Sequence, residues 1–159
     1  MTTTPPAFLA LALTDIVVMS VCCFALVLAT TGMHYEALRA LNLGLAHRVA
    51  ASRARVAVVV LSLSLVHVAE VFVYATAIYL LARHAGMGTL GRAGPPPFDV
   101  ALYFSLETYS SLGYGDVVPS GALRMMAGAE ALNGLLLIGW SASYVHIAME
   151  RFWQPDDHT

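Results

Sequence analysis

Apolar residues fill three long stretches of the chain, and most polar residues lie in the links between them. The apolar stretches run from about residue 6 to 31, from 56 to 82 and from 123 to 149. Each exceeds the roughly 20 residues that an α-helix needs to cross a bilayer. The pattern therefore predicts an all-α membrane protein with three transmembrane helices.

The link between the second and third stretches holds a loop and a short helix. The sequence HAGMGTLGRAGPPP at 84–97 is rich in Gly and Pro, which predicts an extracellular loop. A helix is predicted over 98–110, with Asp99 as its N-cap. Its regular part, Val100 to Ser110, would be about 16 Å long, which is about half a bilayer. This helix must enter the membrane, and the chain must then return.

The return path is the sequence LGYGDVVP at 112–119, with two glycines and an aspartate. Irregular backbone at membrane depth survives only where protein or water satisfies its polar groups. Three helices of one chain do not easily surround such a turn, whereas several chains around a wet axis do. The turn is therefore predicted to line a pore.

Composition agrees with a membrane protein and excludes other classes. The 159 residues are 58% hydrophobic and 11% charged, which is too little charge for the surface of a soluble domain. The net charge is −2, and no basic patch is large enough to indicate nucleic acid binding. Cys22 and Cys23 are expected to be small apolar packing residues. Because the N-terminus lacks a basic region, a cleaved signal peptide is not expected.

Arginine supplies all eight basic residues, and its distribution predicts the orientation. Arg39, Arg48, Arg53 and Arg55 lie between the first two apolar stretches, which indicates that this link is cytoplasmic. With Arg151, five arginines then lie inside and three outside. The N-terminus is expected outside and the C-terminus in the cytoplasm.

The segment Ser111-Leu112-Gly113-Tyr114-Gly115-Asp116 resembles the potassium-channel signature, whose usual form is Thr-Val-Gly-Tyr-Gly-Asp. The order of outer helix, pore helix, filter and inner helix is similar to the pore domain of the bacterial two-helix potassium channels. The resemblance covers about residues 55–152. It implies four identical chains around one axis, a bacterial inner-membrane location, and K⁺ bound at Ser111, Leu112, Gly113 and Tyr114, without an organic cofactor.

The apolar pattern and the resemblance together predict a domain plan. Residues 1–34 form an additional N-terminal transmembrane helix, 35–54 a cytoplasmic Arg-rich linker, 55–152 the pore domain and 153–159 a short cytoplasmic tail. The pore domain divides into an outer helix (55–83), a turret (84–97), a pore helix (98–110), a filter (111–116) and an inner helix (120–152). In the linker, Leu38, Leu41 and Leu45 have helical spacing, so part of it is expected to lie on the membrane surface.

The filter needs these residue types because a dehydrated K⁺ ion requires oxygens in place of its water. Backbone carbonyls supply them if the chain alternates its handedness, which glycine does at low cost, and this explains Gly113 and Gly115. Ser111 departs from the usual threonine: it keeps the hydroxyl but loses the methyl group that fixes the rotamer. We expect K⁺ preference with weaker occupancy at the innermost site.

Glu107 lies four residues before Ser111, where the proton-gated bacterial potassium channel also has a glutamate. The resemblance implies a carboxyl pair of Glu107 and Asp116, which would titrate as a unit. Tyr103 and Phe104 stand where that family has an aromatic pair around the filter, and Tyr103 is expected to donate to Asp116. The alternative for Glu107 is a solvated residue of the pore helix.

Two glycines of the third apolar stretch have two interpretations each. Gly134 falls at the family's hinge position and Gly139 at its second glycine. Close helix packing explains both equally well, because small residues are common in membrane helices.

The stripe Ala142, Ser143, His146 and Glu150 is expected to face the intracellular pore. Four protonated His146 side chains would repel and favour an open gate in acid. Glu150 would oppose this by pairing with a neighbour's His146. The alternative is a histidine hydrogen-bonded at the membrane surface.

Several ionisable residues lie deep in the apolar stretches. His67, Glu70 and Glu130 are expected to form a structural network behind the filter that extends to Glu107, since intramembrane ionisable groups usually pair and face protein. Asp15 is expected to reach the headgroups, and Trp153 to anchor its helix at the interface.

The leading hypothesis is a homotetrameric potassium channel in contact with lipid. No helix carries Arg at every third position, so no voltage sensor is expected, and the short stretch after Arg151 leaves no room for a soluble ligand-binding domain. A weakly selective cation pore and a non-conducting channel-like subunit are the alternatives. An enzyme is not expected, because the sequence has no nucleophile–base pair or metal-ligand spacing.

Overall fold

The structure is a computed structural model that describes residues 6–45 and 52–153. Helix α1 spans Pro6–Ala40 and continues into a short π-helical segment, η1, at Leu41–Leu45. Helices α2, α3 and α4 span Ser52–His84, Phe98–Tyr109 and Leu123–Trp153. Three stretches are long and apolar enough to cross a membrane, namely Leu13–Gly44, Ala54–His84 and Leu123–Glu150. The chain is therefore an all-α, multi-pass membrane protein, as predicted.

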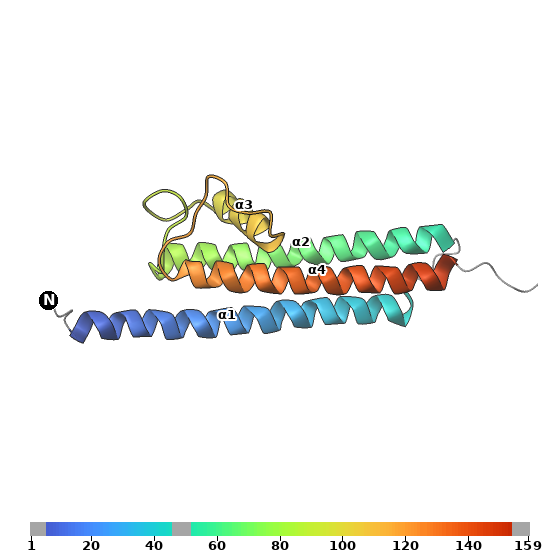
Figure 1. Cartoon of the computed structure of the whole chain (residues 1–159), viewed down its shortest axis with the longest axis horizontal. Helices are drawn as coiled ribbons and strands as arrows, with labels where there is room; N and C mark the ends of the chain where they lie inside the picture. The colour runs from blue at the N-terminus through green and yellow to red at the C-terminus, as the bar shows by residue number, and fades with distance from the viewer. Residues whose placement is uncertain (1–5, 46–51, 154–159) are drawn as a thin grey trace, which may run out of the picture.

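The three long helices lie alongside one another and form one bundle (Figure 1). The short helix α3 packs against α2 and α4 near one end of the bundle, on the side away from α1 (Figure 1). Its 12 residues give a length of about 18 Å, so it is too short to cross a bilayer. The predicted loop, half-length helix and return path therefore lie together on one side of the molecule.

Helix α1 is longer than the sequence predicts. It passes through residues 32–40 without a break, and the non-helical Gly44 (φ 130°) interrupts η1. Leu38 and Leu41 are buried with Val59, Leu63 and Ala148 of α2 and α4. The prediction of a membrane-surface segment is thus wrong for this part, because these leucines pack inside the bundle. Arg48 lies outside the described residues, as do the side chains of Leu45, Arg53, Arg151 and Trp153.

Helix α3 begins directly after three prolines. Pro97 is its N-cap, with φ −69° and ψ 161°, and no side chain caps the helix. Asp99 lies in the first turn and not at the cap, so that prediction is wrong. A carboxylate in the first turn still interacts favourably with the helix dipole.

The loop before α3 is fastened to the segment after the predicted filter. Gly91 N donates to Val118 O at 2.9 Å, and Ser120 N donates to Thr89 O at 2.9 Å. The hydroxyls of Thr89 and Ser120 lie 2.8 Å apart. These bonds tie the loop to the end of the irregular segment that precedes α4.

Candidate functional site

All six residues of the segment Ser111–Asp116 are exposed in the single chain. Leu112 is 79% exposed and Tyr114 48%, although Tyr109 on one side and Val117 on the other are buried. Among the described residues, no backbone–backbone hydrogen bond reaches Gly113, Tyr114 or Gly115. The backbone polar groups here are left for partners that one chain does not supply.

The backbone of this segment departs from the predicted alternation. Gly113 has φ 102°, a value that only glycine adopts readily, as predicted. Gly115 does not have a positive φ, and the prediction for that glycine is wrong. Ser111 instead has φ 55°, the only positive φ of a non-glycine residue in the described chain. Two backbone amides of the segment still bond to α3. Ser111 N donates to Thr108 O at 3.1 Å, and Leu112 N donates to Glu107 O at 3.0 Å.

Glu107 is buried behind the segment, where one of its carboxylate oxygens lies 3.6 Å from the position that a Cβ of Gly115 would occupy. Hydrogen bonding to the Glu107 carboxylate raises the pKa of Tyr103 to about 12, and the nearby Asp116 contributes less. The structure thus brings Tyr103, Glu107, Gly115 and Asp116 together. Tyr103 interacts with both carboxylates, more strongly with Glu107 than with the predicted partner Asp116.

Phe104 is fully buried and supports the segment through an aromatic contact. Its ring stacks on that of Tyr114, with centroids 5.5 Å apart and planes inclined by 17°. Offset-stacked rings of this kind stabilise by about 1 kcal/mol beyond the area that they bury. Phe104 therefore holds the side chain of Tyr114 while the Tyr114 backbone stays exposed.

Gly134 packs closely, whereas Gly139 has space. A Cβ at Gly134 would lie 2.3 Å from the carbonyl oxygen of Tyr109, the last residue of α3. No heavy atom lies within 4 Å of a Cβ at Gly139. Helix α4 continues through both positions. Close packing thus explains Gly134, because it lets the end of α3 approach the α4 backbone.

The predicted pore-facing stripe of α4 is exposed in the single chain. Ala142 and Ser143 are exposed, and His146 and Glu150 are 72% and 64% exposed. His146 Nε2 lies 3.5 Å from Glu150 Oε1 of the same chain, so these two side chains can also pair within one chain. The stripe is accessible to other chains or to water.

The predicted polar network separates into two groups. Tyr109 donates to Glu70, which also lies 3.0 Å from His67 Nδ1, whereas Glu130 accepts a hydrogen bond from Ser105. Among the described side chains, no hydrogen bond links Glu107 to either group. The prediction of one network that extends to Glu107 is therefore wrong.

Sequence reasoning missed residues from helices far apart in the chain. His34 of α1 lies 3.0 Å from Glu70, and Ser141 of α4 contacts both histidines. A second polar contact joins α1 to α4, where Asn133 Nδ2 donates to Thr30 Oγ1 at 2.8 Å. Thr, Ser and Asn are small polar residues of a kind that bridges membrane helices, which is the signal that could have found them.

The remaining predicted positions have simple surroundings. Cys22 and Cys23 are free thiols on α1, partly buried against the core, and Cys23 Sγ lies 3.9 Å from Met126 Sδ. Both act as packing residues. Asp15 is exposed.

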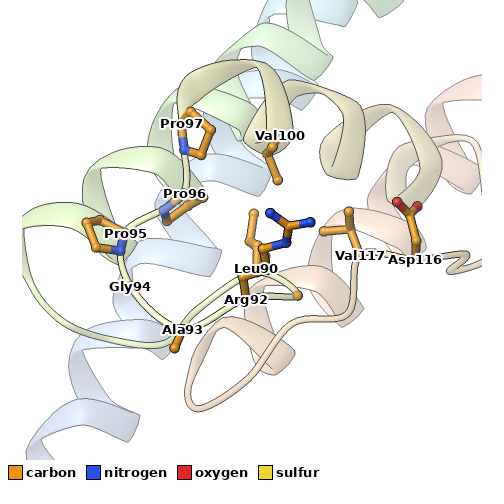
Figure 2. A pocket seen from close by; sticks show the side chains of 11 residues that line it. Leu90, Arg92, Ala93, Gly94, Pro95, Pro96, Pro97, Val100, Asp116 and Val117 are labelled. Atoms are coloured by element: carbon orange, nitrogen blue, oxygen red, sulfur yellow. The ribbon is translucent and has the colours of Figure 1, made fainter.

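A cavity of about 490 Å³ lies behind the end of the segment, between the loop and α3 (Figure 2). Its walls include Arg92, the three prolines at 95–97, Val100, Asp116 and Val117 (Figure 2). Asp116 thus lies between the exposed segment and the pocket beside the loop.

In the described geometry, a short helix and an exposed irregular segment lie between two helices long and apolar enough to cross a membrane. Comparison with known proteins shows the family. The family model described as an ion channel matches residues 66–151. That range includes most of α2, all of α3, the segment Ser111–Asp116 and almost all of α4. The chain therefore belongs to the ion channel family.

A relative from Paramagnetospirillum magnetotacticum, an inward rectifier potassium channel named Kirbac3.1, is 32% identical over 85 residues. The matched part is 53% of this chain and 28% of the relative, so the chain spans just over a quarter of that protein's length. No solved structure matches the chain.

Proposed function

We propose that this chain is the subunit of a potassium-selective channel through which K⁺ crosses the bacterial inner membrane passively. Ser111–Asp116 form the selectivity filter, and the main-chain oxygens of residues 111–114 bind the ion. Four copies surround one axis. The observation that carries the proposal is the exposed, irregular backbone of this segment, placed after a half-length helix in a chain of transmembrane helices.

The exposure of the segment supports an assembly of several chains. Backbone groups that face neither protein nor water cost several kcal/mol each in lipid. Gly113, Tyr114 and Gly115 are exposed and lack backbone partners in the described chain. Identical copies around an axis would cover these residues from the lipid and turn their oxygens toward a common path.

Potassium is favoured over other ions by two observations. The matched relative is named a potassium channel. Gly113 also has the positive φ that an alternating filter backbone requires, and Tyr114 is held by the stacked Phe104 ring. Carbonyl oxygens in such a backbone replace the water of a K⁺ ion.

The orientation and the gate follow from charges. The N-terminus lies outside and the C-terminus in the cytoplasm, since the Arg-rich link precedes α2. His146 lies near the cytoplasmic end of α4, and protonation of four copies would favour an open gate in acid. If His146→Ala leaves the pH–current curve unchanged, this gating role is wrong. His146 is then only a residue that forms hydrogen bonds at the membrane surface.

A weakly selective cation channel is the second candidate, and the backbone of Ser111 favours it. Ser111 has φ 55°, where β-branched residues such as threonine are strained. Serine keeps a hydroxyl there without a methyl group that fixes its position. Reversal potentials in mixed K⁺ and Na⁺ separate the two candidates, since a weakly selective pore reverses near zero.

Flux into liposomes tests the proposal. The full chain is reconstituted in vesicles loaded with K⁺, and collapse of the gradient is followed with a pH dye and a proton ionophore. The proposal predicts K⁺-dependent flux that Ba²⁺ blocks and that Na⁺ alone does not support. A chain that is folded in the vesicles but gives no flux would be the non-conducting subunit.

A further inference from the structure

Side chains from four elements meet inside the helix bundle, away from Ser111–Asp116. His34 comes from α1, His67 and Glu70 from α2, Ser141 from α4, and Tyr109 from the end of α3. His34 and Glu70 are fully buried, and the His67 side chain is 20% exposed. These side chains join the N-terminal helix to the three elements of the pore unit.

The two histidines have the same arrangement around Glu70. The Nδ1 atom of His34 lies 3.0 Å from Glu70 Oε1, and that of His67 lies 3.0 Å from Glu70 Oε2. The Nε2 atom of His34 lies 3.3 Å from the hydroxyl oxygen of Ser141, and that of His67 lies 2.9 Å from the same oxygen. Each ring therefore points one nitrogen at the carboxylate and the other at a shared hydroxyl.

This arrangement leaves a place for a cation. A serine hydroxyl has two acceptor lone pairs, so Ser141 can accept an N–H from both rings. Each Nδ1 then presents a lone pair to a carboxylate oxygen, and lone pairs at 3.0 Å repel unless a positive charge lies between them. A metal-bound histidine usually directs its other N–H to such an acceptor.

The charge of Glu70 also requires a partner. Burying an ionised carboxylate without compensation costs several kcal/mol. In the described chain, His34, His67 and Tyr109 all contact the Glu70 carboxylate. Protons on the two histidines or a bound metal ion can compensate its charge.

We propose that His34, His67 and Glu70 form an intramembrane binding site for a divalent transition-metal ion of the Zn²⁺ class. Two imidazoles and a carboxylate are a donor set that suits Zn²⁺, with a fourth position left over. The candidate ligand atoms lie within 4.8 Å of one another, and around a tetrahedral Zn²⁺ they would lie about 3.4 Å apart. Small side-chain movements convert one arrangement into the other.

Tyr109 is placed to complete the site. Its hydroxyl lies 2.8 Å from His67 Nδ1 and donates to Glu70. The Tyr109 hydroxyl therefore contacts two of the three candidate ligands. Because Tyr109 lies two residues before Ser111, the bound metal would fasten α1 to the base of the filter segment.

Metal content tests the site without reference to ion flux. The full chain in lipid nanodiscs is stripped with a chelator, incubated with ZnCl₂, desalted and analysed by elemental mass spectrometry. We expect one Zn²⁺ per chain, and a loss of at least about tenfold in affinity for His34→Ala, His67→Ala and Glu70→Gln. The exposed His84 gives the matched control, and His84→Ala should bind as the wild type does.

A second variant separates metal binding from folding. Ser141→Ala keeps all three ligands but removes the acceptor that orients both rings, so its Zn²⁺ affinity should fall about 10- to 100-fold. Cobalt(II) gives an independent readout, with intense visible absorption from a four-coordinate site in the wild type and none in Glu70→Gln. If the wild type retains no more Zn²⁺ than Glu70→Gln, or if His84→Ala loses as much as His34→Ala, protons hold the cluster and the proposal is wrong.

Discussion

The segment Ser111–Asp116 and the His34–His67–Glu70 cluster differ in what a single chain completes. The segment is exposed, and its central backbone amides have no backbone partners within the described chain. The cluster is largely buried, and with Ser141 and Tyr109 it joins side chains of four elements that already contact one another. The segment Ser111–Asp116 therefore depends on other chains, whereas a single folded chain already assembles the cluster.

This difference separates assembly from stability. Changes in the exposed segment should alter conduction while the single-chain bundle stays folded. Changes in buried contacts of α3 and α4 should alter the stability of the bundle first, because they remove packing or hydrogen bonds that one chain already makes. The predictions below test this separation.

The largest expected effect is that of Gly113→Ala. Gly113 has φ 102°, and a Cβ there is strained whatever the available space. We expect K⁺ flux in liposomes to fall to background while the bundle stays folded, with a loss of only about 1 kcal/mol in stability from the local backbone strain. Gly128→Ala is the control, since no atom lies within 4 Å of its Cβ position. If the Gly113→Ala variant conducts K⁺ as the wild type does, the claim that the exposed segment carries conduction is wrong.

Gly134→Ala should act on stability. Its Cβ would lie 2.3 Å from the Tyr109 carbonyl oxygen, so α3 or α4 must move. Overpacking of this kind costs about 1–3 kcal/mol, which thermal unfolding in detergent would detect. Gly139→Ala has free space at its Cβ, and it should be neutral or slightly stabilising because alanine favours a helix. Equal stability of the two variants would contradict the packing role of Gly134.

Tyr109→Phe should have a comparable effect on stability, of about 1–3 kcal/mol. It removes the hydroxyl that donates to Glu70 and leaves that buried carboxylate less satisfied. Tyr103→Phe is the control, since Tyr103 is exposed and its loss should change unfolding little. If the Tyr103→Phe variant is less stable than the Tyr109→Phe variant, the claim that the Tyr109 hydroxyl matters more for stability is wrong.

The smallest expected effect is a pH dependence at Tyr103. Hydrogen bonding to Glu107 raises the pKa of this phenol to about 12 from an ordinary 10.0, so the folded chain holds the proton where an unfolded chain has lost it. The stabilisation is complete below about pH 10 and is lost as the pH rises to about 12. The difference in phenolate absorbance between wild type and Tyr103→Phe isolates this step. Glu107→Gln should move the midpoint down, and an unmoved midpoint would exclude Glu107 as its cause.

Much of the fold was predictable from sequence, because length and hydropathy determine which segments cross a membrane. The half-length α3 followed from the prolines before Phe98 and from the glycines after Ser111. The bounds of α1 did not follow, since Leu38 and Leu41 are buried by α2 and α4, which come later in the chain. Sequence periodicity reports an apolar face but does not tell whether lipid or protein covers it.

The candidate site was predictable where it depends on local sequence. The resemblance to the bacterial potassium channels predicts that Glu107 lies near Asp116, and the structure brings both to Tyr103. The positive φ of Gly113 follows from the glycine itself. The partners of Glu70 were not found, because His34 lies 36 residues away in sequence, on another helix. The role of Gly134 was equally hidden, since it depends on the position of the Tyr109 carbonyl.

The central claim is that main-chain oxygens of residues 111–114 from identical chains bind a dehydrated K⁺ ion. The most direct measurement is the reversal potential of the purified full chain in a planar bilayer with K⁺ on one side and Na⁺ on the other. The account predicts single-channel currents that reverse close to the K⁺ equilibrium potential and disappear in Gly113→Ala. Currents that reverse near zero, or that persist unchanged in Gly113→Ala, would contradict it.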